Sequence, residues 1–165
     1  MSTIIEIKRY QEKDVEEYMH MCKKAFGKHN VFDKSLRDVR DYLRKKDKAD
    51  RILGGLFFAY DDDEFVGGAL LRVEMKDLDC SHARYKYNHV VAKDNKVKSA
   101  ILNFLEEKIK HDIHAKRIKS AKVEVGLVET EEDLELYKKA GFKIEGVLAS
   151  HYKHKENVIA LGKEI

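Results

Sequence analysis

A helix-like segment between two strand-like segments is the feature of this sequence that most restricts its fold. Residues 84–92 (RYKYNHVVA) alternate as a strand does, and residues 122–128 (KVEVGLV) follow the same period. The apolar residues between them recur at the spacing of one buried helix face, at Val97, Ala100, Ile101, Phe104, Leu105, Ile109 and Ile113. A strand, a long helix and a second strand in this order predict a crossover that places two parallel strands in one sheet.

The flanking segments predict the rest of a mixed sheet. Residues 52–60 and 65–75 are apolar runs around the acidic turn DDDE, which predicts an antiparallel hairpin with a solvated tip rather than a metal site. The other expected elements are a strand over 3–9, a helix that begins after Asp14, a helix over about 34–48, a short helix closed by Gly141, and strands over 142–152 and 157–165. The fold class is therefore α/β, in the order β-α-α-β-β-β-α-β-α-β-β, with helices on both faces of a mixed sheet.

Composition excludes several classes of protein. The 33 Lys and Arg residues nearly balance the 30 Asp and Glu residues, so a nucleic-acid binder that depends on electrostatics alone is excluded. No apolar run approaches the roughly 20 residues of a membrane span, and the N-terminus does not resemble a signal peptide. Cys22 and Cys80 lie far apart and fit a reduced protein. We expect one globular domain over residues 1–165, located in the cytoplasm.

Several strings resemble the GCN5-related N-acetyltransferase (GNAT) superfamily. The clearest is LYKKAGF (136–142), which is similar to the family segment L-Y-x-x-x-G-F, where a short helix ends at glycine before the next strand. The opening IKRYQEKDVEEY and the ending EGVLASHYKHKENVIALGKEI are similar to the family's first strand and helix and to its last two strands. This resemblance covers nearly the whole chain, and it implies a GNAT-like sheet whose central parallel strands splay apart.

The resemblance also implies a site for acetyl-coenzyme A between the splayed strands. The pyrophosphate of the coenzyme would lie on amides at the start of the following helix, where the helix dipole favours anions. The family pattern R/Q-x-x-G-x-G/A falls on residues 96–101 (KVKSAI), so Ser99 and Ile101 stand where glycines are usual. Ile101 either crowds the phosphate or points into the core, and Lys96 and Lys98 are either compensating cations or solvated lysines. The implied coenzyme contacts are Val90, Val91, Lys93, Lys96, Val97, Lys98, Ser99, Ala100, Ile101, Thr130 and Tyr137.

Acetyl transfer to an amine needs a proton donor for the departing thiolate and a base for the ammonium proton. Tyr137 matches the family tyrosine that faces the cofactor sulfur, and its alternative role is that of a core tyrosine. Glu124 resembles the strand glutamate that acts as base in some protein N-terminal acetyltransferases of the family, and its alternative is an outward-facing strand residue. His89 is a second candidate base, because the pKa of histidine lies near neutrality, and it competes with a packed or surface histidine.

The acceptor side is expected on one face of the strand over 84–92 and in the last hairpin. Alternation places Tyr85, Tyr87, His89 and Val91 on one side of that strand, which we interpret as the acceptor cleft. His151 and Tyr152 stand where family members often contact the acceptor amine. The eight histidines have no cysteine or acid at ligand spacing, so no metal site is predicted.

The resemblance therefore implies an acetyl-CoA-dependent N-acetyltransferase that modifies a primary amine, on a protein N-terminus or a small molecule, by direct attack in a ternary complex. The alternative is a degenerate GNAT-fold protein that binds acyl-CoA or a protein partner without catalysis, which the missing glycines favour. The expected partners are acetyl-CoA and the amine acceptor, with no nucleic acid and no membrane. Edge strands near the C-terminus are compatible with a homodimer.

Overall fold

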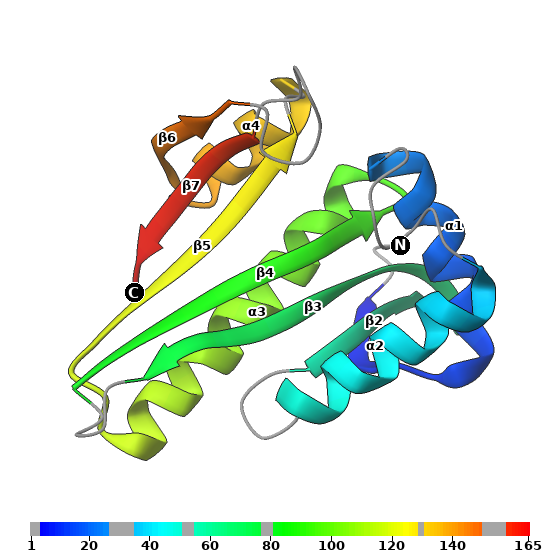
Figure 1. Ribbon diagram of the computed structural model, residues 1–165, viewed down its shortest axis with the longest axis horizontal. Helices are drawn as coiled ribbons and strands as arrows, with labels where there is room; N and C mark the ends of the chain where they lie inside the picture. The colour runs from blue at the N-terminus through cyan, green and yellow to red at the C-terminus, as the bar shows by residue number, and fades with distance from the viewer. Residues whose placement is uncertain (1–3, 27–34, 51–54, 77–80, 129–130, 150–157) are drawn as a thin grey trace.

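A seven-stranded mixed sheet organises the computed structural model, which describes residues 4–26, 35–50, 55–76, 81–128, 131–149 and 158–165 (Figure 1). The strands are β1 (Ile5–Arg9), β2 (Gly55–Asp61), β3 (Glu64–Lys76), β4 (His82–Ala92), β5 (Ser120–Val128), β6 (Lys143–Leu148) and β7 (Val158–Glu164). The helices are η1 (Glu12–Asp14, a 3-10 turn), α1 (Val15–Phe26), α2 (Leu36–Asp50), α3 (Asn95–Lys116) and α4 (Glu131–Lys139). The predicted order of strands and helices is confirmed.

The strand order in space is β1-β2-β3-β4-β5-β7-β6. Only β4 and β5 run parallel among these neighbours, and α3 forms the crossover between them. The hairpin of β2 and β3 turns at Asp62 and Asp63, both of which have positive φ angles, as short turns between antiparallel strands require. The predicted hairpin and the predicted parallel pair are both present.

Two apolar layers hold the helices against the sheet. The first lies between the sheet and the helices α3 and α4, and it includes Tyr85, Ile101 and Tyr137. The second lies between the sheet and the helices α1 and α2, and it includes Tyr18, Leu43 and Phe58. Helices therefore cover both faces, as predicted, but Figure 1 shows α1 and α2 over β2, β3 and one end of β4 only. The same face of β5, β7, β6 and the rest of β4 has no described helix over it, and we call it the uncovered face.

A bulge in β4 overturns one predicted side-chain alternation. Leu70 pairs with Asn88 and Gly68 pairs with Val91, so β4 contains one residue more than β3 between these pairs. His89 lies in this bulge with a φ of 54°, a left-handed conformation. The extra residue reverses the alternation, because Tyr85 and Tyr87 belong to the α3 layer whereas Val91 belongs to the α1–α2 layer. The prediction that these residues and His89 share one side is therefore wrong.

Strand β6 forms one edge of the sheet and is its most exposed strand. It pairs with β7 on one side, and Ile144, Val147 and Leu148 are 49%, 56% and 45% exposed. The homodimer expected from these edge strands stays a prediction. Among the described residues, no helix combines the length and the apolar character that crossing a membrane would require.

Candidate active site

The two parallel strands separate halfway along their length. β4 and β5 pair from His82 with Ser120 to Tyr87 with Val125. Beyond this point the rest of β4 pairs with β3, and the rest of β5 pairs with β7, so the two strands diverge in Figure 1. The carbonyl of His89, inside the diverging part of β4, accepts a hydrogen bond of 2.8 Å from the Tyr18 hydroxyl. Divergence of this kind exposes strand backbone that an extended ligand can pair with.

The N-terminus of α3 lies next to this opening, and it is capped by the protein itself. Asp94 is the N-cap residue, and its carboxylate accepts a hydrogen bond of 2.9 Å from the Val97 amide. Val97 and Ile101 are each 1% exposed and pack in the α3 layer. Of the two alternatives for Ile101, the structure therefore supports the core position, and its side chain does not lie over the helix end.

The lysines around this helix end differ in their partners. The Lys98 ammonium lies 2.7 Å from Asp133 on α4, and its side chain is 14% exposed. Lys93 lies 3.7 Å from Asp61, at the end of β2. Lys96 is exposed and has no ion-pair partner among the described residues. Lys96 is consequently the cation that is best placed to meet an added phosphate, whereas the charge of Lys98 is already balanced.

Tyr137 lies on α4 beneath the point where the strands separate. It is 1% exposed, and its ring packs edge-on against Phe142 with a centroid distance of 5.4 Å. Burial raises the pKa of Tyr137 well above its ordinary value, and the nearby Asp133 carboxylate raises it further. Its hydroxyl has no hydrogen-bond partner among the described residues. The side chain thus keeps its proton and has a donor to offer.

Glu124 lies on the opposite face of the sheet from Tyr137. Val123 and Val125 pack in the α3 layer, so the side chain between them points to the uncovered face. The carboxylate lies 3.9 Å from Arg84 and 3.8 Å from Lys122, and it is 32% exposed. It lines a cavity of about 280 Å³ over β5, β7 and β6. The two candidate proton-transfer groups therefore flank the separation from opposite sides.

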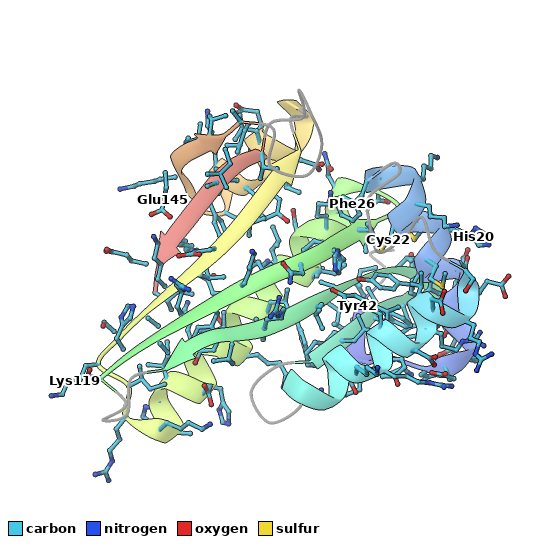
Figure 2. All side chains as sticks on the ribbon, viewed as in Figure 1. His20, Cys22, Phe26, Tyr42, Lys119 and Glu145 are labelled. Atoms are coloured by element: carbon cyan, nitrogen blue, oxygen red, sulfur yellow. The ribbon has the colours of Figure 1, made fainter. Side chains whose placement is uncertain are left out.

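The His89 side chain lies on the same face of the sheet as Glu124, but it packs against helices α1 and α2. Its ring centroid is 6.1 Å from that of Phe26 and 6.2 Å from that of Tyr42, and its Nε2 atom is 3.4 Å from the Tyr42 hydroxyl. Figure 2 shows Phe26 and Tyr42 on α1 and α2, well apart from Glu145 at the β6 edge. The aromatic helix residues and the β6 edge thus lie at two ends of this face.

Tyr85 and Tyr87 lie on the α3 side of the sheet, away from Glu124 and His89. Both are buried in the α3 layer, and the Tyr85 hydroxyl donates a 2.6 Å hydrogen bond to Asp112 on α3. The bulge at His89 separates the face of these two tyrosines from that of His89, and their predicted contact with the acceptor stays a prediction.

Three other predicted site residues, Thr130, His151 and Tyr152, lie outside the described residues. Within the described part of the chain, no group of three or more His, Cys, Asp or Glu side chains is arranged to hold a metal ion.

The residues that sequence reasoning missed are charged strand residues of the uncovered face. Arg84 and Lys86 alternate with the two buried tyrosines on β4, and Glu145 on β6 forms an ion pair with Lys122 on β5. The alternation itself was the available signal, since polar residues between buried tyrosines must point to the other face. The capping role of Asp94 was also missed, although an aspartate directly before a helix is its ordinary signal.

Comparison with solved structures shows which proteins share this architecture. No family model and no curated protein matches the sequence. The Brucella melitensis ribosomal-protein-alanine N-acetyltransferase matches with a TM-score of 0.71 at 14% identity, over 97% of this chain and 99% of that one. A GNAT-family acetyltransferase from Streptococcus pneumoniae matches with a TM-score of 0.67 at 17% identity, over 98% and 99% of the two chains.

A third match includes a bound bisubstrate compound. Arabidopsis thaliana Naa50, in complex with the bisubstrate analogue CoA-Ac-MVNAL, matches with a TM-score of 0.68 at 15% identity, over 98% and 99% of the chains. Further matched structures are a spermidine N-acetyltransferase chimera and aminoglycoside 6'-acetyltransferases, so the shared architecture leaves the acceptor open. The splayed β4–β5 pair and these full-length matches together show that this chain has the fold of the GNAT acetyltransferases.

Proposed function

We propose that this protein is an acetyl-CoA-dependent N-acetyltransferase that acts on a primary amine. The observation that carries this proposal is the pair of Tyr137 and Glu124, which flank the β4–β5 separation from opposite faces of the sheet. Direct transfer needs an acid on the thioester side and a base on the amine side, with a passage between them.

The residues around the opening fit acetyl-CoA in part. The diverging backbone of residues 88–92 suits the pantetheine arm, which would pair with it as an added strand. Lys96 suits the pyrophosphate, since its ammonium is exposed and without a partner among the described residues. Asp94 is less suited, because its carboxylate already accepts the Val97 amide.

The proposed reaction is one direct displacement. The amine nitrogen bonds to the thioester carbonyl carbon, its surplus proton passes to Glu124, and the carbon–sulfur bond breaks. The departing sulfur receives a hydrogen bond from the Tyr137 hydroxyl, and the coenzyme A thiolate then takes its proton from solvent. Glu124 is favoured over His89 as base, because Glu124 lines the cavity beside the separation whereas the His89 ring packs among Phe26 and Tyr42.

Calorimetric titration with acetyl-CoA tests the proposal. We expect wild-type binding at micromolar concentrations, and we expect Lys96→Ala to raise Kd about fivefold, as loss of one exposed charge pair does. Lys119→Ala is the matched control, since it removes the same charge at the far tip of the molecule (Figure 2). Absence of acetyl-CoA binding, or absence of transfer to every member of a primary-amine panel, would contradict the proposal.

The second candidate function is a non-catalytic module that binds acyl-CoA or a protein partner. The observation that favours this second function is the Asp94 carboxylate at the N-terminus of α3. It accepts the hydrogen bond of the Val97 amide, and its negative charge repels phosphate. Titration with the amine panel in the presence of acetyl-CoA distinguishes the two candidate functions, because only an enzyme releases free coenzyme A.

Asp94→Asn should tighten acetyl-CoA binding about threefold. The amide side chain still caps the helix, while the negative charge next to the pyrophosphate position is removed. The gain in affinity should shrink at high salt, because screening weakens the repulsion that the wild-type carboxylate exerts. Equal affinity of the two proteins at low salt would mean that phosphate does not approach this helix end.

A further inference from the structure

The uncovered face of β4, β5, β7 and β6 carries an unusual row of charges. β4 contributes Arg84 and Lys86, β5 contributes Lys122 and Glu124, and β6 contributes Glu145. Arg84 lies beside Lys122 in the parallel register, and Lys86 lies beside Glu124. Arg72 on β3 lies beside Lys86 in turn, and Glu164 on β7 lies beside Lys122. These residues surround the end of the paired part of β4 and β5, immediately before the strands separate.

The charges on this face are compensated unequally. The Lys122 ammonium lies 2.5 Å from Glu145, so these two side chains neutralise each other. Glu124 has only the longer contacts of 3.8 and 3.9 Å with Lys122 and Arg84. Lys86 makes no ion pair among the described residues, although Glu124 is its neighbour on the next strand. The ammonium of Lys86 is therefore a positive charge without an ion-pair partner among the described residues.

Arg84 provides a second incomplete interaction at this place. Its Nε atom is buried and has no hydrogen-bond partner among the described residues, and its nearest carboxylate oxygen is 3.9 Å away. A buried donor without an acceptor is costly, so the positive charge of Arg84 is compensated by Glu124 only in part. Arg84 thus adds positive charge beside Lys86, and Lys86 is the β4 cation that lines the cavity next to Glu124.

Lys86 and Glu124 also share a cavity. Together with Glu145 and an apolar wall that includes Leu148 and Val158, they line a space of about 280 Å³. Neighbouring strands lie about 4.8 Å apart, so the ammonium of Lys86 and the carboxylate of Glu124 enter this space from adjacent positions. A space of this size accommodates a group about as large as one amino-acid residue and offers it both signs of charge.

We infer that the acceptor carries a carboxylate next to its amine, and that Lys86 binds this carboxylate while Glu124 faces the amine. This inference rests on the proposed function, since it specifies the acceptor of that same site. The feature that such an acceptor must present is an ammonium group and a carboxylate group on the same residue. A free amino acid presents it, and so does a peptide whose first residue is acidic.

Matched probes, in which the neutral partner carries amides in place of the carboxylates, test the inference. Aspartate is compared with its diamide, and the tripeptide amide Asp-Ala-Ala is compared with Asn-Ala-Ala, each by NMR titration of the protein with and without acetyl-CoA. We expect at least one anionic probe to bind about tenfold more tightly than its neutral partner, as a charge-assisted hydrogen bond would produce. The aspartate pair and the peptide pair distinguish the two sources of the acceptor.

The variants Lys86→Met and Lys86→Glu identify the residue responsible. Lys86→Met should abolish the preference for the anionic probe, and Lys86→Glu should reverse it, while Lys119→Met leaves it at the wild-type ratio. Because Lys86 is a half-buried strand residue, its replacement can affect folding. Melting temperatures equal to that of the wild-type protein confirm that both variants fold.

The outcomes separate this inference from the proposed function. Equal binding of the paired probes, or a preference that survives in Lys86→Met, overturns the inference. Equal acetylation of the anionic and neutral probes by the wild-type protein also overturns the inference, but the proposed N-acetyltransferase function then stands. Failure to bind acetyl-CoA overturns the proposed function, and the acceptor assignment fails with it even if the anionic probes still bind.

Discussion

Tyr137→Phe is expected to lower kcat for acetyl transfer by about 100-fold, the loss that follows removal of one hydrogen-bond donor aimed at developing negative charge. Burial raises the pKa of the Tyr137 hydroxyl, so the phenol stays protonated at every pH at which the protein is assayed. Its main contribution is therefore the hydrogen bond to the sulfur as the thiolate forms. For the same reason, no alkaline loss of activity below about pH 10 should arise from Tyr137.

The stability of this variant should be close to that of wild type. The Tyr137 hydroxyl has no hydrogen-bond partner among the described residues, so its removal leaves no described group unpaired. The ring contact with Phe142 is kept by phenylalanine. Steady-state kinetics and thermal unfolding of the same preparation therefore measure the two effects separately.

Tyr85→Phe is the matched control. Tyr85 is equally buried on the same side of the sheet, but its hydroxyl donates to Asp112 and lies away from the separation of β4 and β5. It should lose about 1–2 kcal/mol of unfolding free energy and keep its kcat. A normal kcat in Tyr137→Phe, or an equal fall in both variants, would remove Tyr137 from the reaction.

Ile101→Gly should destabilise the protein by about 3–6 kcal/mol, the sum of a core truncation and of a glycine inside a helix. Ile101 is 1% exposed and packs in the α3 layer, so the truncation leaves a cavity. The substitution restores the residue that the GNAT pattern has at this position. It should nevertheless leave acetyl-CoA affinity unchanged, because the Ile101 side chain does not cover the helix end.

Urea unfolding and acetyl-CoA titration at low temperature measure both quantities. Ser99→Gly is the control, since Ser99 is half-buried in the same helix turn and its replacement should cost only about 0.5 kcal/mol. Tighter acetyl-CoA binding by Ile101→Gly would show that the isoleucine blocks the phosphate, which the sequence alone left open.

Much of the fold was predictable because it depends on local periodicity. The long helix from Asn95 to Lys116 has its apolar residues on one face, and the β2–β3 hairpin has its acidic turn. The segment ending at Gly141 was identifiable from its short string, and the structure ends α4 just before it, with a positive φ at this glycine. The position of β7 between β5 and β6 was not predictable, because strand order depends on pairing between distant segments.

The candidate site was predictable only in part. Alternation correctly separates Glu124 from Val123 and Val125, but the same rule fails at His89, where one extra residue reverses the faces of β4. No pattern in the sequence marks that residue, since the bulge arises from the register between β3 and β4.

The sequence by itself determined the order of strands and helices and the position of Tyr137 before the last two strands. These features depend on neighbours within a few residues. Only the tertiary structure decided where β4 and β5 separate and that Ile101 belongs to the core. It also decided that Lys122 pairs with Glu145 while Lys86 makes no ion pair within the described chain. Ion pairs between strands depend on side chains that are distant in the chain and meet only after the sheet has formed its register.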